Sequence, residues 1–273
     1  MESFEINRRN WDERVVLHAA SEAYGLERFR SDPHHLSDVV RFDLERLGPI
    51  EGLRVVHLQC HIGTDTVSLA RLGAAHVTGL DFSPPALAVA RQLATSLELP
   101  VDFVEADCYS APAVLGQGRF DLVYTGIGAL CWLPDIDRWA KVVSDLLAPG
   151  GRLFVREGHP VLWSLDYGIH DQLVIAHPYF ETDDPIVDDE ETTYVDSDAT
   201  LLNSVSHSWN HGLAEIITAL MAHGLQLTGF VEHMSVPWMA LPEQMMAGQA
   251  GEWVLKDRPA RLPLTYTIQA VKA

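Results

Sequence analysis

The sequence has few basic residues. Its 273 residues include 19 Lys and Arg against 38 Asp and Glu, which gives a formal net charge of −19 at pH 7. Proteins that bind nucleic acid usually carry a basic surface that neutralises phosphates, so this balance argues against a nucleic-acid substrate. A small neutral or cationic substrate fits an acidic protein more easily.

Cysteines are also scarce, and long apolar runs are absent. Cys60, Cys108 and Cys131 are widely spaced and form no CxxC pair, which predicts reduced thiols in a cytoplasmic protein. No uninterrupted apolar run is long enough to span a bilayer, and the start of the sequence has no basic-then-apolar leader. We therefore expect no membrane partner.

One stretch has an unusual excess of charge. Residues 181–198 contain nine acidic residues and no basic one. Their spacing matches no metal-ligand motif, so we expect no metal and predict a solvated loop or an edge hairpin.

The most informative stretch runs from Arg54 to Asp81. Residues 55–58 form a short apolar run typical of a strand in a parallel sheet, and Gly63 interrupts it before a helical segment. A second apolar run ends at Asp81, 18 residues after Gly63. A strand, turn, helix and strand that end on an acidic residue predict half of a Rossmann-like nucleotide-binding sheet, in which the acid binds ribose hydroxyls.

Several motifs resemble those of class I S-adenosylmethionine (SAM)-dependent methyltransferases of the small-molecule type. VVHLQCHIGTDT (55–66) resembles their motif I, GLDFSP (79–84) their acidic motif, DLV (121–123) their fourth motif, and LLAPGGRLFV (146–155) a later turn and strand. Motif I is a variant. The family usually has an acidic residue and Gly-x-Gly-x-Gly, whereas this chain has His57, Gln59, His61 and Gly63.

The resemblance implies an α/β fold, with a seven-stranded, mostly parallel Rossmann-like sheet and helices on both faces. We expect one domain over residues 1–273. It would comprise a helical cap (1–50), a SAM-binding core (51–158), an insertion on the substrate side after the fifth strand (159–208) and the end of the sheet (209–273).

The resemblance also implies SAM-dependent methyl transfer to a small-molecule acceptor, with S-adenosylhomocysteine as the product. Whether oxygen, nitrogen or carbon is methylated stays open. By resemblance, Asp81 binds the ribose, Asp107 the adenine amino group, and Phe82 packs on the adenine ring. The other expected cofactor contacts are Gln59, Cys60, His61, Gly63, Cys108, Thr125 and Gly126.

Aromatic and imidazole side chains outside the core are candidates for the acceptor pocket. These are Trp11, His18, Tyr24, Tyr179, Trp209 and Trp238, although such residues also serve simply to anchor segments to a core. If the acceptor must lose a proton, His159 and His207 are the candidate bases. An amine or a carboxylate acceptor would need no base, and either histidine could be structural.

Two other functions stay open. A nicotinamide-dependent oxidoreductase would require a fuller glycine-rich turn to hold a pyrophosphate, and the turn here is bulky. A non-catalytic SAM-binding scaffold would keep the fold and lack turnover. The affinity for SAM separates the first from a methyltransferase, and turnover of bound SAM separates the second.

Overall fold

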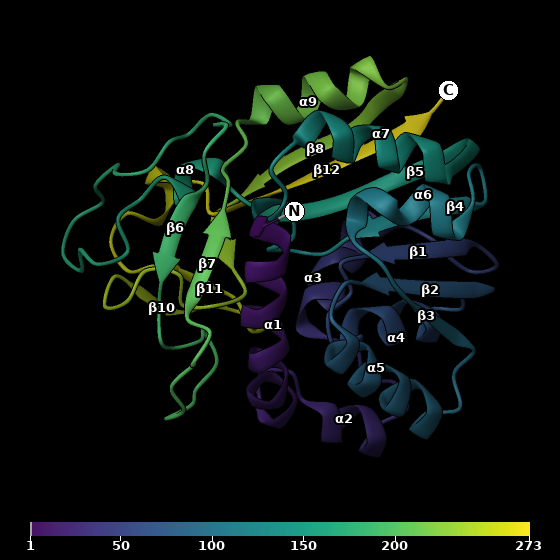
Figure 1. Ribbon diagram of the computed structural model, residues 1–273, viewed down its shortest axis with the longest axis horizontal. Coiled ribbons are helices and arrows are strands. Elements are labelled where there is room, and N and C mark those ends of the chain that lie inside the picture. Colours follow the sequence, from purple (N-terminus) through teal and green to yellow (C-terminus); the bar gives the residue numbers. More distant parts are fainter. Residues whose placement is uncertain (1) are drawn as a thin grey trace.

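A seven-stranded sheet forms the centre of the computed structural model, which describes residues 2–273 (Figure 1). The strand order is β3-β2-β1-β4-β5-β12-β8, with β12 antiparallel to both of its neighbours and the other pairs parallel. This confirms the predicted Rossmann-like sheet. The strands are β1 (Arg54–Leu58), β2 (His76–Asp81), β3 (Val101–Glu105), β4 (Phe120–Thr125), β5 (Leu147–Gly158), β8 (Leu225–His233) and β12 (Thr265–Lys272).

Helices cover both faces of this sheet. Because successive side chains of a strand point to opposite faces, Val55 packs against one set of helices and Val56 against the other. The set on the side of Val56 comprises α6 (Ala111–Leu115), α7 (Ile136–Leu146) and α9 (Leu213–Ala222). The opposite set includes α3 (Asp38–Leu47), α4 (Thr64–Arg71) and α5 (Pro84–Ser96).

Local sequence signals explain several helix ends. The side chain of Ser37 accepts a hydrogen bond from the Val40 N–H and so caps α3. Helix α4 begins at Thr64, but its cap residue is Gly63, which has no side chain to accept a bond. A Cβ atom at Gly63 would lie 2.7 Å from the Ala90 Cβ, so glycine lets α4 start close to α5.

The N-terminal cap is helical, with two interruptions between its three helices. Helices α1 (Glu2–Ala20) and α2 (Leu26–Ser31) are separated by a turn that contains Tyr24. The helix ends before Tyr24, and Gly25 has a φ of 57°. No helix of residues 2–273 combines the length and the apolar character needed to cross a membrane.

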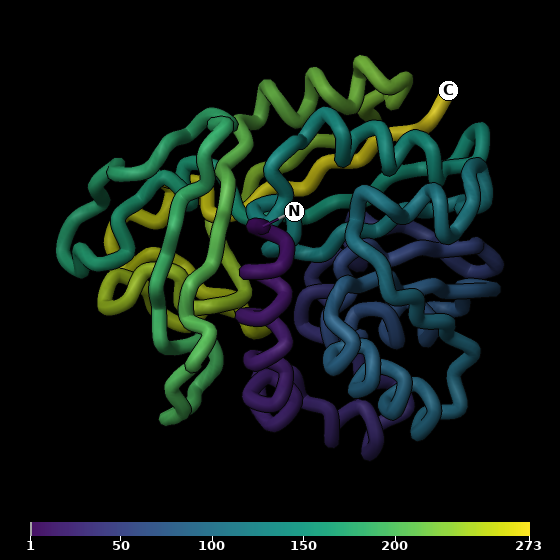
Figure 2. Tube along the Cα trace, viewed as in Figure 1, coloured from purple at the N-terminus to yellow at the C-terminus, as the bar shows by residue number. Residues whose placement is uncertain are grey.

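Helix α1 lies between the sheet core and a two-stranded ribbon (Figure 2). The ribbon pairs β6 (Ile186–Asp189) with β7 (Val205–Ser208), so part of the acidic stretch forms a hairpin, one of the two expected forms. The Asn7 side chain donates to the His207 carbonyl at 2.8 Å, and the Asn10 side chain donates to the Asn203 carbonyl at 2.7 Å. These bonds fasten the inserted ribbon to the cap.

The Met- and Trp-rich segment after β8 builds a second, smaller core. Strands β9 (Ser235–Val236), β10 (Met245–Ala247) and β11 (Trp253–Leu255) form a three-stranded sheet. Its buried side chains pack with Leu162 of α8 (Pro160–Trp163). The Trp238 ring stacks on the Trp163 ring at a centroid distance of 5.8 Å.

A polar network is buried between the main sheet, α3 and the smaller sheet. Arg156 Nη2 donates to Glu252 Oε2 at 2.7 Å, and the Arg156 guanidinium lies 3.6 Å from the centre of the Phe42 ring. The Tyr124 hydroxyl donates to Asp43 Oδ2 at 2.6 Å. Burial raises the pKa of Asp43 to about 7, despite the nearby Arg156 charge and this hydrogen bond.

The raised pKa predicts a pH-dependent effect of Asp43→Asn. The folded state holds a proton on Asp43 more tightly than the unfolded state does, so stability falls as the pH rises from about 4 to about 7. The amide keeps an acceptor for Tyr124 without a charge. We therefore expect Asp43→Asn to raise the free energy of unfolding at pH 8 by about 1–4 kcal/mol, with the gain disappearing near pH 4.

Urea unfolding at pH 4.5 and pH 8 measures this difference. Asp102→Asn is the control, because the Asp102 side chain is 71% exposed. An Asp43→Asn variant that is equally destabilised at both pH values would contradict the prediction.

Candidate cofactor site

The turn after β1 has a left-handed backbone at three alternate residues. Gln59, His61 and Gly63 have φ angles of 55°, 48° and 79°. For the two residues with a Cβ atom this conformation costs about 1–2 kcal/mol each. Such strain gathers at functional sites. The turn thus keeps a glycine-like backbone where its sequence has Gln and His.

Asp81, the last residue of β2, faces this turn. Its Oδ2 accepts a hydrogen bond from the His61 N–H at 2.8 Å, and its Oδ1 accepts one from the Ser83 N–H at 2.9 Å. Burial raises the pKa of Asp81 to about 6, and the backbone bonds partly offset this effect. Since each carboxylate oxygen has a second acceptor position, Asp81 can also accept bonds from two ligand hydroxyls.

Two buried acceptor atoms, Gln59 Oε1 and Thr125 Oγ1, lie at the carboxyl ends of β1 and β4. The Gln59 side chain donates from Nε2 to the Ala129 carbonyl at 2.9 Å. Its Oε1, and the Oγ1 of Thr125, have no hydrogen-bond partner among residues 2–273. A buried polar atom without a partner is costly, and open α/β sheets bind their ligands at this edge. These acceptor atoms therefore fit a polar ligand that carries hydrogen-bond donors such as hydroxyl or ammonium groups.

Aromatic and imidazole rings cover the turn from the side of α1. The Nδ1 of His18 lies 2.8 Å from the Nε2 of His61, and the Nε2 of His18 lies 2.7 Å from the Thr193 Oγ1. The Trp11 ring meets His61 edge-on at 5.1 Å and Trp132 at 5.4 Å. Burial lowers the pKa of His18 to about 2 and that of His61 to about 3, so both rings are neutral.

The chain is similar to known proteins in both sequence and fold. Residues 55–151 match a family model described as "Methyltransferase domain". The chain is similar to a crystal structure of an S-adenosylmethionine-dependent methyltransferase from Mesorhizobium loti. The sequences are 22% identical, the alignment covers 91% of this chain and 100% of the other, and the TM-score is 0.59. Residues 55–151 are thus similar to a methyltransferase domain, and the sheet has the fold of a class I methyltransferase.

Curated relatives match the same region. A demethylmenaquinone methyltransferase from Thermus thermophilus is 40% identical over 90 residues, which cover 33% of this chain and 40% of the relative. A ubiquinone biosynthesis O-methyltransferase from Ralstonia nicotianae is 34% identical over 128 residues, which cover 46% of this chain and 52% of the relative. The chain thus spans about half, or less, of the length of these relatives.

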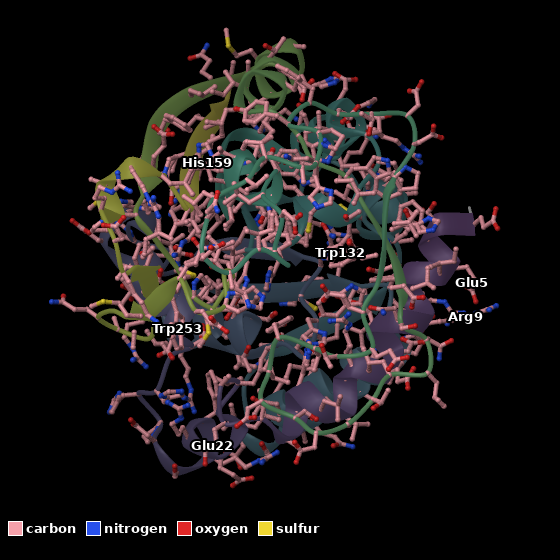
Figure 3. The ribbon with its side chains drawn as sticks, turned by 90° about the vertical axis from the view of Figure 1, so that its left-hand side faces the viewer. Glu5, Arg9, Glu22, Trp132, His159 and Trp253 are labelled. Carbon is pink, nitrogen blue, oxygen red and sulfur yellow. The ribbon has the colours of Figure 1, made fainter. Side chains whose placement is uncertain are left out.

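The residues predicted for the acceptor pocket fall into two groups. Trp11, His18 and Tyr24 gather on His61, and the Tyr24 hydroxyl is hydrogen bonded to that of Tyr194. Figure 3 shows Trp132 on the inner side of α1, whereas Glu5 and Arg9 project from its outer side.

The second group lies near the end of β5. Trp209 lines a cavity of about 10 Å³ together with Trp163 and Tyr266. Trp238 reaches this region through its stacking on Trp163. The Tyr179 hydroxyl accepts a hydrogen bond from the Leu213 N–H at 3.4 Å, at the start of α9.

The two candidate bases are both engaged in other contacts. His159 accepts at Nδ1 from the Val161 N–H at 3.1 Å, and its Nε2 lies 2.9 Å from Glu232 Oε1. His159 lies apart from Trp132, beside the C-terminal strands (Figure 3). The Nδ1 of His207 lies 2.9 Å from the Ser3 Oγ. A catalytic role for His159 would require one of its hydrogen bonds to break.

Among the other predicted cofactor contacts, Asp107 and the cysteines have evident structural roles. The Asp107 carboxylate accepts from the Ser110 N–H at 3.1 Å and from its hydroxyl at 2.6 Å. Cys108 packs in the core on the α7 side of the sheet. Burial raises the pKa of the Cys60 and Cys108 thiols, which makes them poor nucleophiles. Phe82 is half-buried directly after Asp81, and a Cβ at Gly126 would lie 3.3 Å from the His57 ring.

Three features of the site were not predicted. Trp132 packs on Trp11, and the Thr193–Tyr194 segment contacts His18 and Tyr24, through tertiary contacts that leave no local pattern in the sequence. Glu157 is 2% exposed and contacts the loop after β4. Its signal was present, since Glu157 follows the apolar run 153–155 of β5 after one intervening arginine.

If the turn is strained, alanine and glycine variants should rank in opposite orders of stability at position 61, in the turn, and at position 76, in β2. His61→Ala keeps a Cβ atom at a positive φ, and His61→Gly removes it, so the glycine variant should be more stable by about 0.5–1 kcal/mol. The same pair at His76, which lies in β2 and has no positive φ, should rank alanine above glycine. Urea unfolding of the four variants checks both rankings. An alanine variant that is the more stable at position 61 would show that the turn is not strained.

Proposed function

We propose that this protein is a SAM-dependent methyltransferase that transfers a methyl group to a small-molecule acceptor by in-line displacement. The observation that carries the proposal is the Asp81 carboxylate, which faces the left-handed turn and has acceptor positions left for two ribose hydroxyls. The methyltransferase match over residues 55–151 and the names of the relatives support it.

Specific residues of this chain would hold the cofactor. Asp81 would bind the ribose, Phe82 would pack on the adenine ring, and Asp107 would accept from the adenine amino group with the lone pairs that Ser110 leaves. The unpartnered Gln59 Oε1 would accept from the ammonium of the methionine portion, with Thr125 nearby. The bound cofactor would supply the activated methyl group, and the protein would supply orientation, which contributes on the order of 7–11 kcal/mol in such reactions.

The acceptor would bind near the end of β5, where Trp209, Trp238 and Tyr179 lie. The net charge of −19 favours a neutral or cationic acceptor. The relatives, named for ubiquinone and menaquinone methylation, support a small organic acceptor. The cap (1–50), the SAM-binding core (51–158), the insertion (159–208) and the end of the sheet (209–273) would form one domain. Three free, buried cysteines support a cytoplasmic location.

Calorimetric titration with SAM and with S-adenosylhomocysteine tests the proposal. We expect micromolar affinity for both ligands and at least a hundredfold loss in Asp81→Ala, because two ribose hydrogen bonds to a charged group disappear. Asp102→Ala is the matched control on the neighbouring strand and should bind normally. A wild-type protein that binds neither ligand would overturn the proposed function.

A further inference from the structure

The Glu157 carboxylate, at the end of β5, is surrounded by backbone N–H groups. Its Oε1 accepts from Gly128 at 2.7 Å and from Gly158 at 2.6 Å. Its Oε2 accepts from Ala129 and from Leu130, each at 2.8 Å. Three of these donors belong to the loop that follows β4, so one buried side chain fixes the path of that loop.

The same loop is bonded to the turn that follows β1. Ala129 donates its N–H to Glu157 and accepts at its carbonyl from Gln59 Nε2 at 2.9 Å. One residue of the loop therefore connects the end of β5 with the strained turn. This bond fixes the orientation of the Gln59 amide, whose Oε1 is buried and has no hydrogen-bond partner among residues 2–273.

We propose that Glu157 is a positioning residue for cofactor binding: its carboxylate holds Ala129, and Ala129 holds Gln59 in the orientation that receives SAM. This inference rests on the proposed function. Glu157 itself would not contact the cofactor. A carboxylate is required because all four neighbours are donors, and a neutral amide would direct its NH₂ group at two of them.

A double-mutant cycle on SAM affinity tests the inference. Glu157→Gln should weaken SAM binding about tenfold, which corresponds to one or two lost charge-assisted bonds in the chain of contacts. In a Gln59→Ala background the same substitution should change the affinity less than about twofold, because the side chain that Glu157 positions is already gone. A residue that only stabilises the fold would give equal effects in both backgrounds.

Hydrogen exchange of the loop amides provides a second readout. The N–H groups of Gly128, Ala129 and Leu130 should exchange at least about tenfold faster in Glu157→Gln than in the wild type. Glu252→Gln is the matched control. Like Glu157, Glu252 is a buried carboxylate, but it pairs with Arg156 rather than with the loop after β4. It should lower the unfolding midpoint without selective exchange at 128–130.

Glu157→Asp provides a second variant for the same test in case Glu157→Gln does not fold. It keeps the charge but is one methylene shorter, so it cannot reach all four donors and should show the same non-additivity with Gln59→Ala. A wild-type protein that binds SAM, with unchanged affinity in the Glu157 variants or equal losses in both backgrounds, would overturn this inference alone. A wild-type protein that does not bind SAM would overturn the proposed function as well.

Discussion

The hydrogen bond from the His61 N–H to Asp81 is the contact on which the site depends. It joins the turn after β1 to the end of β2 and holds the turn in a conformation that Gln59 and His61 would otherwise avoid. The adjacent parallel strands bring these two segments together. The covering rings of α1 then pack on a turn whose shape is already set.

The side chains of Gln59 and His61 make contacts that glycines at these two positions could not make. His61 turns toward α1 and forms an imidazole pair with His18, so the cap is attached to the turn by a specific contact. Gln59 turns toward the loop after β4 and reaches Ala129. Backbone strain in the turn is therefore offset by contacts that connect the cap, the core and the loop, which a glycine turn could not make.

The sheet could be predicted from the sequence because its signals are local. Short apolar runs mark the strands and Gly63 marks a reversal between strand and helix, and a mostly parallel Rossmann-like sheet follows from them. Asp81 could be assigned for the same reason. The cover of the site could not be predicted, because its contacts join residues more than 100 positions apart in the sequence. Trp132 contacts Trp11, and Thr193 and Tyr194 contact His18 and Tyr24. The Arg156–Glu252 pair, 96 residues apart, likewise left no pattern.

A crystal structure with bound S-adenosylhomocysteine tests the central claim most directly, namely that a turn with Gln59 and His61 holds this cofactor. The account predicts both ribose hydroxyls within hydrogen-bond distance of Asp81, the amino group of the ligand at Gln59 Oε1, and positive φ angles retained at residues 59 and 61. A ligand bound elsewhere, or a turn that loses its left-handed backbone around the ligand, would contradict the account.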